Sequence, residues 1–444
     1  MAGLFGVVLN GNSLKDLHEG TFYLQHRAQT YCGLLWYQGR ELSGNTGKGL
    51  LEENFSLSAL EKVNADYALG SVSVTREPFS GLSRYHGGVM SFDGHIKNNV
   101  ELRDKLLRNG SKFSGHHNPS NITDCEILTD IVLEGPTFEN GVERLVNDMK
   151  GDFSLVFLTD HGIYASRGWG RKPLILGKKE TENGMNYAVS SESTSFINTG
   201  FEIERDVNPG ETVFLDKSGI HHVAQIDLGN DVKFGTFEWI YSAYPTSLID
   251  GRWVSEVRKK MGSLLMEAYP VEADIVSGIP NSGRWHGIGF NHESYAQGMG
   301  IPYEEVFVRY DYAGRSFTAS EKKAQQRTAD RKLIPVIPSI NDKKIVLVDD
   351  SIVRGTQTQN QTARLRKFGA KEIHARIACP PLMAACGYGK STKKDEDCIA
   401  RIMSIEDIRT TRHLDSLKYA TVEMLGKAID FPKEKLCLTC WGFN

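Results

Sequence analysis

The chain has 444 residues, which is long for one ordinary domain and predicts two domains of roughly 200 residues each. Its apolar fraction of 40% and charged fraction of 24% are typical of a globular protein in water. The formal net charge of -3 argues against nucleic-acid binding as the main function, because such domains carry a strong basic excess. The sequence contains neither a run of about 18 apolar residues nor the charged start and apolar stretch of a secretory signal. We therefore expect a cytoplasmic protein without a nucleic-acid or membrane partner.

The chain contains seven cysteines, an odd number spread over much of its length. This usage does not predict a disulfide framework, which is typical of short secreted chains. Only Cys437 and Cys440 form a CxxC pair, a spacing that suits a metal ion or cluster. Structural thiols without a ligand are the alternative interpretation of this pair.

The first half of the chain is rich in short apolar or alternating runs that end at Gly, Asn or Asp. Residues 13–28 and 124–135 interrupt this pattern with helical spacing of apolar residues. The expected strands are residues 4–10, 31–39, 67–74, 88–96, 152–160, 162–168, 173–178, 186–191 and 211–216. Runs of strands with segregated helices predict an α+β layered domain that ends near residue 230.

In the second half, strands and helices alternate, which predicts a parallel sheet with crossover helices. The expected helices are residues 255–269, 283–300 and 356–370, and the expected strands are residues 273–280, 302–310, 343–350 and 372–379. Ligands of such sheets bind at the carboxyl ends of the strands. Residues 312–332 form a long, polar connection rich in basic residues, which favours a functional flap.

The stretch from Ile345 to Thr358 combines an apolar strand, two acids and a turn into a helix. Asp349 and Asp350 can hold ribose hydroxyls directly or through a hard cation such as Mg²⁺. The hydroxyls and backbone N–H groups that follow lie at a helix N-terminus, which attracts anions, and Arg354 adds a partner for phosphate. A strand end with an acidic turn and a helix cap is the alternative interpretation. The full combination favours the binding of phosphoribosyl pyrophosphate (PRPP).

Residues 346–356, VLVDDSIVRGT, closely resemble the PRPP motif of the amidophosphoribosyltransferase family, the glutamine-dependent enzymes that start purine synthesis. Nearly the whole chain resembles this family in the same order, including LQHRAQ, DCEILTDI, GDFSLVFLTD, VEADIVSGIPNSG and FGAKEIHARIACPP. The resemblance implies an Ntn-hydrolase-like glutaminase domain with four αββα layers over residues 1–230. It also implies a type I phosphoribosyltransferase domain over residues 231–444, with a Rossmann-like parallel sheet and a helical, cysteine-containing tail. We further expect a homo-oligomer, a dimer or a tetramer.

The resemblance assigns the PRPP site of the second domain. Asp349 and Asp350 match the acids that hold ribose and Mg²⁺, and together with Arg309 they are the expected catalytic residues. Ser282 is the third residue expected at the Mg²⁺ ion, and Asn281 stands where the family has Asp. The expected PRPP-binding residues are Ser282, Gly283, Asp349, Asp350, Ser351, Arg354, Gly355, Thr356, Gln357 and Thr358. Among them, Gln357 replaces the usual Thr.

The segment from Arg309 to Lys332 resembles the loop that closes over PRPP in this family. Arg309 stands where the family has Lys, which keeps a cation for the pyrophosphate. Asp311 stands where the family has Arg. A carboxylate beside a polyphosphate is repulsive, so we expect a different closed state or a different ligand.

The glutaminase half departs from the family at three positions that carry its chemistry. Ala2 replaces the nucleophilic Cys that directly follows the initiator Met, and a methyl group cannot attack glutamine. Ser73 replaces the Arg that binds the glutamine carboxylate, and Asp93 replaces the Asn of the oxyanion hole, while Gly94 is retained. A carboxylate at that place opposes the developing negative charge. We therefore expect an Ntn scaffold without glutaminase activity, and a misaligned domain that uses another Cys is the alternative.

Many bacterial members of the family hold an iron–sulfur cluster through four cysteines. Cys386, Cys437 and Cys440 fill three of the corresponding positions, and Gly235 stands at the fourth. Three thiolates with an external ligand can hold a cluster, whereas four cysteines are the usual ligation. A cluster and an incomplete set of thiols both stay open at this point.

Two functions from different classes follow from these residues. The first is a PRPP- and Mg²⁺-dependent phosphoribosyltransferase that takes its amine from ammonia, a partner glutaminase or another small nucleophile. The second is an inactive PRPP- or nucleotide-binding homologue that regulates or scaffolds a partner or pathway enzyme. Asn281 and Asp311 favour the second function, and the retained 5′-phosphate loop from Ser351 to Thr358, called the phosphate loop below, favours the first.

Overall fold

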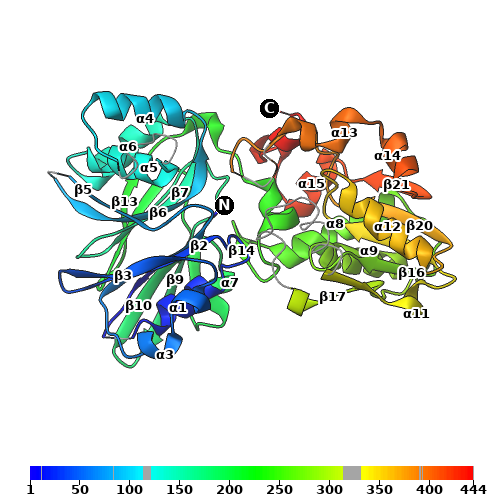
Figure 1. The fold of residues 1–444 in the computed structure, drawn as a ribbon, viewed down its shortest axis with the longest axis horizontal. Coiled ribbons are helices and arrows are strands. Elements are labelled where there is room, and N and C mark those ends of the chain that lie inside the picture. The colour runs from blue at the N-terminus through cyan, green and yellow to red at the C-terminus, as the bar shows by residue number, and fades with distance from the viewer. Residues whose placement is uncertain are drawn as a thin grey trace. The chain divides into compact units, whose positions relative to one another are not determined.

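The computed structural model describes residues 1–11, 13–83, 85–113, 122–313, 332–389, 392 and 394–443. The chain folds into two compact units, and Figure 1 labels many of their helices and strands. The N-terminal unit comprises Met1–Gly235, Thr246–Gly251 and Gly387–Ser391. The C-terminal unit comprises Thr236–Pro245, Arg252–Cys386 and Thr392–Asn444.

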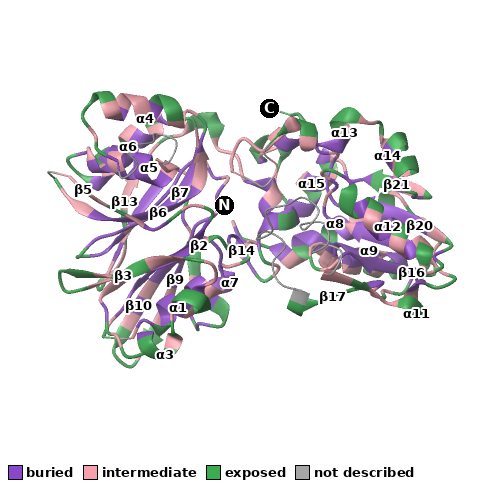
Figure 2. Cartoon of the chain, viewed as in Figure 1, coloured by how far each residue is buried: buried purple, intermediate pink, exposed green. Residues whose placement is uncertain are grey.

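Two antiparallel sheets form the centre of the N-terminal unit. The first sheet has the order β11 (Glu202–Asp206), β9 (Ile175–Thr181), β10 (Gly184–Ser190), β1 (Gly3–Val8), β4 (Tyr67–Ser73), β2 (Tyr31–Gln38) and β3 (Glu41–Lys48). The second sheet has the order β13 (Gly219–Gln225), β12 (Glu211–Asp216), β8 (Ile163–Arg167), β7 (Gly151–Leu158), β6 (Gly87–Ile96) and β5 (Phe79–Leu82). Figure 2 shows buried residues along the strands of both sheets.

Helices cover the outer face of each sheet. The helices on the first sheet are α1 (Lys15–Phe22), α2 (Leu51–Asn54), α3 (Leu57–Leu60) and α7 (Thr194–Ile197), and those on the second are α4 (Asn99–Arg108), α5 (Asp124–Leu133) and α6 (Phe138–Asp148). Along β1, Phe5 and Val7 pack with the helices, whereas Leu4 and Val8 pack against Val156 of the second sheet. This alternation follows from the period of two in a strand. The expected αββα layers are therefore confirmed.

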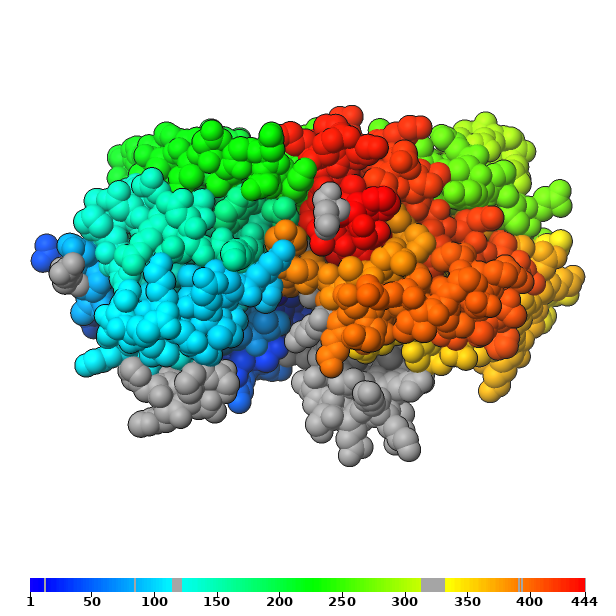
Figure 3. Space-filling model, turned by 90° about the horizontal axis from the view of Figure 1, so that it is seen from above, coloured from blue at the N-terminus to red at the C-terminus, as the bar shows by residue number. Residues whose placement is uncertain are grey.

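The C-terminal unit contains a parallel sheet with the order β16 (Ile275–Gly278), β19 (Lys344–Asp349), β20 (Glu372–Ile377) and β21 (Ser416–Tyr419). Its helices are α8 (Val254–Ala268), α9 (Arg284–Ala296), α11 (Ile337–Ile340), α12 (Thr356–Lys367), α13 (Ile399–Ile402), α14 (Ile405–Thr411) and α15 (Val422–Ile429). Helices between successive strands produce the expected Rossmann-like arrangement. In the space-filling view of Figure 3, the chain from α12 onward, amber to red, forms a continuous part of the surface.

Residues 302–310, predicted as one strand, adopt a different structure. β17 (Phe307–Arg309) is short and pairs antiparallel with β18 (Leu333–Pro335), outside the parallel sheet. Earlier in the segment, Tyr303 makes an isolated parallel bridge to Val276. The apolar pattern indicates an extended segment, but it does not specify which strands pair. The remaining short strands are β14 (Leu248–Ile249) and β15 (Arg252–Trp253). Among the described residues, we find no helix with the length and apolar character needed to cross a membrane.

Candidate functional site

Two carboxylates, which we call the acid pair, emerge at the carboxyl end of β19. Asp349 ends the strand, and the buried Asp350 follows it. The Asp350 N–H donates to Asp349 Oδ1 at 3.0 Å, and the Ser351 hydroxyl donates to Asp350 Oδ2 at 2.6 Å. Burial, and then the charge of Asp350, raises the pKa of Asp349 well above its usual range.

The acid pair fits a hard divalent cation, because a cation would offset the repulsion between two crowded carboxylates. Mg²⁺ is commonly held by one or two carboxylates together with substrate oxygens and water. In the described part of the chain, no group of three or more His, Cys, Asp or Glu side chains is arranged to hold a metal ion. The remaining ligands of such a cation would therefore come from other oxygens, including those of the substrate.

The loop after the acid pair leads into the start of α12, where the phosphate is expected. Gly355 is the N-cap and has a φ of 69°, in the left-handed region that glycine adopts without a steric penalty. The first N–H groups of a helix have no partner within it, so they are available to a phosphate. Thr356 and Gln357 are exposed and Thr358 is buried. The hydroxyls expected at this loop thus differ in their access to a ligand.

Arg354 contacts a carboxylate in this structure. Its Nε and Nη2 lie 2.9 and 2.8 Å from Asp397 Oδ1, and its side chain is 69% exposed. The hydrogen bond to Asp397 raises the pKa of Arg354 further above its ordinary value. A phosphate contact by Arg354 requires this ion pair to open or to be shared, and the contact stays a prediction.

A second loop, Gly278–Gly283, follows β16 at the same edge of the sheet, because β16 and β19 pair in parallel. Gly283 has no room for a side chain: a Cβ would lie 2.3 Å from the Val348 carbonyl oxygen and 2.7 Å from the Ile279 nitrogen. The Ile279 N–H also donates to the Val348 carbonyl at 2.9 Å. The half-buried Ser282 therefore belongs to a loop that packs directly on the end of β19.

Two side chains that the sequence did not assign to the site also interact with the acid pair. Tyr241 lies on the π-helical turn η3 (Glu238–Ser242), and burial, followed by the charges of Asp350 and Asp349, raises its pKa. Cys379 lies just beyond β20, and burial, followed by the charge of Asp350, raises the pKa of its thiol well above the usual range. The rule that ligands bind at strand ends could have indicated Cys379. No sequence signal indicated Tyr241, because periodicity does not predict a π-helical turn.

The described start of the expected flap carries a local ion pair. Arg309 Nε lies 3.2 Å from Asp311 Oδ1, and the side chains are 46% and 80% exposed. Burial, and then the positive charge of Arg309, lowers the pKa of Lys332 at the other end of the flap. Residues 314–331, the central part of the flap, lie outside the described residues.

In the N-terminal unit, the residues at the expected glutaminase site form a buried charge network. The Ala2 N–H donates to Asp93 Oδ1 at 2.9 Å, and both residues are buried. Arg27 Nη2 lies 2.6 Å from Asp93 Oδ2, and Lys172 Nζ lies 3.3 Å from Asp93 Oδ1. Arg27 Nε also donates to the Ala2 carbonyl at 2.7 Å. The Asp93 side chain therefore accepts hydrogen bonds at the position where the resemblance to the family implies an amide donor.

The network extends from Arg27 to a second acid, Glu192. Arg27 Nη1 and His26 Nε2 lie 2.5 and 2.8 Å from Glu192 Oε1, and the Ser247 hydroxyl donates to Glu192 Oε2 at 2.8 Å. The sequence analysis did not single out Arg27, Lys172 or Glu192. Their burial was not predicted, because charged residues are mostly solvated and a sequence does not state which of them pair.

The other expected glutaminase positions are also described. The buried Ser73 donates its hydroxyl to a backbone carbonyl two residues later. Arg76, the nearest arginine in sequence, donates its Nε to Thr46 Oγ1 at 2.9 Å on an exposed surface. At Gly94, a Cβ would lie 2.4 Å from the Asp152 carbonyl oxygen, so this strand position has no room for a side chain.

The cysteines do not fit a four-thiolate cluster. Cys386 and Cys437 are half-buried and Cys440 is buried. At Gly235, where the fourth ligand is expected, a Cβ would lie 2.3 Å from the Arg171 carbonyl oxygen. The described residues also contain no group of three or more potential ligands arranged around a metal position.

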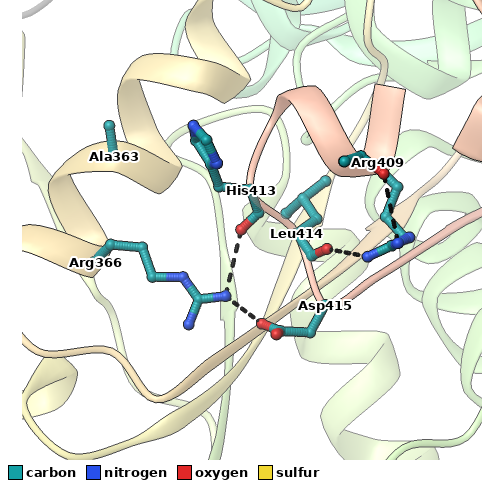
Figure 4. Close-up of a pocket in the computed structure, with 7 residues that line it drawn as sticks. Ala363, Arg366, Arg409, His413, Leu414 and Asp415 are labelled. Carbon is teal, nitrogen blue, oxygen red and sulfur yellow. Dashed lines mark hydrogen bonds and ion pairs between the residues drawn. The ribbon is translucent and has the colours of Figure 1, made fainter. Parts of the chain in front are cut away.

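A cavity of about 530 Å³ lies beside α12 and α14 in the C-terminal unit (Figure 4). Its lining residues are Ala363, Arg366, Arg409, Thr410, His413, Leu414 and Asp415. Arg366 is ion-paired with Asp415 and donates to the His413 carbonyl, and Arg409 donates to the Leu414 carbonyl at 2.8 Å. The two guanidinium groups thus hold α12 and α14 to the residues that precede β21. The cavity also lies toward the C-terminal half of α12, away from the phosphate loop at its start.

The two units together define a class of protein: an Ntn-type αββα unit with a phosphoribosyltransferase unit that carries an acid pair and a phosphate loop. Residues 69–198 match a family model described as a glutamine amidotransferase domain. The chain is 33% identical to the amidophosphoribosyltransferase of Methanothermobacter thermautotrophicus, over 96% of this chain and 89% of that protein. It is 30% identical to that of Bacillus subtilis, over 99% and 92%.

A solved structure shows the same overall likeness. The glutamine PRPP amidotransferase from Bacillus subtilis, complexed with ADP and GMP, matches with a TM-score of 0.87 and 29% identity. The match covers 99% of this chain and 96% of that one. The chain belongs to the amidophosphoribosyltransferase family.

Proposed function

We propose that the protein is a PRPP-dependent phosphoribosyltransferase that does not hydrolyse glutamine. It transfers the phosphoribosyl group to ammonia or another small nucleophile and releases pyrophosphate. The transferase activity is inferred from the acid pair, which lies between two strand-end loops. Family membership supports the same activity.

Different residues at the carboxyl edge of the sheet bind different parts of PRPP. The loop from Ser351 to Thr358 holds the 5′-phosphate through N–H groups and hydroxyls. Asp349 and Asp350 orient the ribose hydroxyls, and their negative charge stabilises the positive charge that develops at C1 as pyrophosphate leaves. The Gly278–Gly283 loop receives the pyrophosphate. The acid pair and Ser282 would hold Mg²⁺ together with substrate oxygens, and the ion would supply charge stabilisation for the leaving group.

The loss of glutaminase activity is proposed from the buried network around Asp93. Ala2 provides no thiol, and Asp93 is engaged by Arg27, Lys172 and the Ala2 N–H. An oxyanion would meet a carboxylate instead of an amide donor. Ser73 provides no cation for the glutamine carboxylate. The amine must then come from solution or from a partner glutaminase.

The proposal is tested by calorimetric titration with PRPP and Mg²⁺, followed by assays of pyrophosphate and glutamate release. We expect binding, steady pyrophosphate release with ammonia, and no glutamate from glutamine. Asp350→Asn should lower the ammonia-dependent rate by about 100-fold or more, because it removes charge from the transition state. Asp342→Asn is the matched control at an exposed, Lys371-paired carboxylate and should retain the rate.

A second candidate, a non-catalytic PRPP or nucleotide binder that regulates a partner, is favoured by the Arg309–Asp311 ion pair. This pair partly neutralises the cation expected to contact pyrophosphate. Tight binding without turnover, across ammonia and a panel of small amines, would establish this candidate in place of the enzyme. Steady turnover with any of these nucleophiles would exclude it.

A further inference from the structure

Arg412, at the end of α14, lies against the phosphate loop. A Cβ built on Gly355 would lie 2.9 Å from Arg412 Nε and 3.4 Å from its Nη2. The guanidinium group therefore occupies the space beside the backbone of the residue that caps α12. The sequence analysis gave no role to this arginine, which lies 57 positions beyond Gly355 in the printed sequence.

The fold holds Arg412 in this place through the turn that follows it. His413 has a φ of 54°, a conformation that is uncommon for a residue with a side chain. Asp415 accepts the Ile373 N–H at 2.6 Å and is ion-paired with Arg366. The turn is thus tied to β20 and to α12, the two elements that follow the phosphate loop.

Among the described residues, Arg412 has no ion-pair partner, and its Nε is buried without a hydrogen-bond acceptor. Acids of the surrounding elements pair with other arginines: Glu406 with Arg409, Asp397 with Arg354 and Asp415 with Arg366. A buried donor without an acceptor destabilises a fold. An unpaired cation beside an anion-binding loop would be stabilised by a bound anion.

We propose that Arg412 is a positioning residue that supplies the phosphate loop with positive charge for the 5′-phosphate of PRPP. The inference rests on the proposed function and names a residue for its phosphate subsite. Arg354, the arginine within the loop, is held by Asp397, whereas Arg412, beside Gly355, has no ion-pair partner in the described part of the chain. Its charge adds to the partial positive charge at the start of α12.

The test measures binding of ribose 5-phosphate and of PRPP with Mg²⁺ to the full chain by calorimetry at low and high salt. Arg412→Met and Arg412→Gln remove the charge, and Arg412→Lys retains it. We expect the two neutral variants to weaken ribose 5-phosphate binding by about 10-fold at low salt, with a smaller effect at high salt, because salt screens charges. Arg412→Lys should stay within about 3-fold of wild type by the same argument. KM for PRPP should rise more than kcat falls.

Lys371→Met is the charge control, because Lys371 is an exposed cation of the same unit that is paired with Asp342. Its binding should equal that of wild type. The inference would be overturned if the neutral Arg412 variants kept the wild-type melting temperature and bound ribose 5-phosphate as tightly as wild type at both salt concentrations. An equal loss in all three Arg412 variants, independent of salt, would show a steric role and overturn it as well. Wild-type protein that binds neither ligand would overturn the proposed function, and the inference with it.

Discussion

Asp93 differs from the expected asparagine only by an oxygen in place of an amide nitrogen, but this change reverses its electrostatic role. Its carboxylate accepts the Ala2 N–H and is held by Arg27 and Lys172. An amide can donate to a developing oxyanion, whereas a carboxylate cannot. The two cations also explain how a charge can remain buried here, because buried charges require partners.

Glu77 is a second buried acid of the N-terminal unit. The hydroxyls of Ser91 and Thr75 and the Phe92 N–H donate to its carboxylate. Burial outweighs these donors and raises the pKa of Glu77 from 4.5 to about 7. Because the folded pKa lies above the unfolded one, Glu77 contributes stability below about pH 4.5 that is lost as the pH rises through about 7.

We expect Glu77→Gln to remove this pH dependence. Between pH 5 and pH 8, the stability of the variant relative to wild type should rise by up to about 2.5 kcal/mol, because the neutral amide has no charge to bury. The melting temperature of the N-terminal unit by scanning calorimetry at both pH values provides the measurement. Glu180→Gln, at an exposed position, serves as the control. Its difference in melting temperature from wild type should be the same at the two pH values. A Glu77→Gln effect that does not change with pH contradicts the prediction.

At the scale of elements, the candidate site consists of two loops that leave neighbouring parallel strands. The Ile279 N–H donates to the Val348 carbonyl, which joins the loop after β16 to the end of β19. Gly283 packs against the same carbonyl. The Gly278–Gly283 loop and the acid pair are thus positioned by one contact between strand ends.

Gly283→Ala should disturb this contact, because its Cβ would lie 2.3 Å from the Val348 oxygen. We expect PRPP binding to weaken by about 10-fold or more, and stability to fall by about 1 to 3 kcal/mol, as in other overpacked sites. Calorimetric titration and thermal melting measure the two effects. Gly426→Ala in α15 is the control, because the nearest atom to its Cβ is the Phe431 carbonyl oxygen at 3.2 Å. Wild-type PRPP affinity in Gly283→Ala would separate this loop from the binding site.

At the scale of the whole molecule, the two units carry different parts of the family's chemistry. The C-terminal unit keeps an acid pair and strand-end loops suited to PRPP. The N-terminal unit keeps the αββα layers, but its expected active-site positions hold a buried charge network. The scaffold can persist without the reaction because packing between layers, not the catalytic residues, stabilises it.

Ala2→Cys therefore should not restore glutaminase activity. The new thiol would lie near the Asp93 carboxylate, which disfavours the reactive thiolate, and Ser73 would still provide no cation for glutamine. We expect no glutamate release and an unchanged ammonia-dependent rate. Ala2→Ser is the control for the added side-chain volume. Glutamate release by Ala2→Cys alone would contradict our interpretation of Ser73 and Asp93.

Much of the fold could be predicted from local patterns. The expected helix over residues 13–28 contains α1, the expected strand over residues 343–350 contains β19, and the expected strand over residues 4–10 overlaps β1 except at Gly3. α4 and α6 were not predicted, because they lie in polar segments and are stabilised as helices by packing against the second sheet. The extended segment at residues 302–310 was predicted, but its pairing outside the parallel sheet was not.

The sequence by itself determined the class of fold, and it predicted the phosphate loop and the replacements at Ala2, Ser73 and Asp93. The phosphate loop is a local feature, because it depends on residue type and on spacing over a few positions, whereas the three replacements follow from the resemblance to the family. Only the tertiary structure decided which charges meet: Lys172 with Asp93, and Arg412 with Gly355. The members of each pair lie far apart in the chain, so their contact depends on how sheets and helices pack. The first contact supports the proposal that glutamine is not used, and the second supports the proposal for how the phosphate is held.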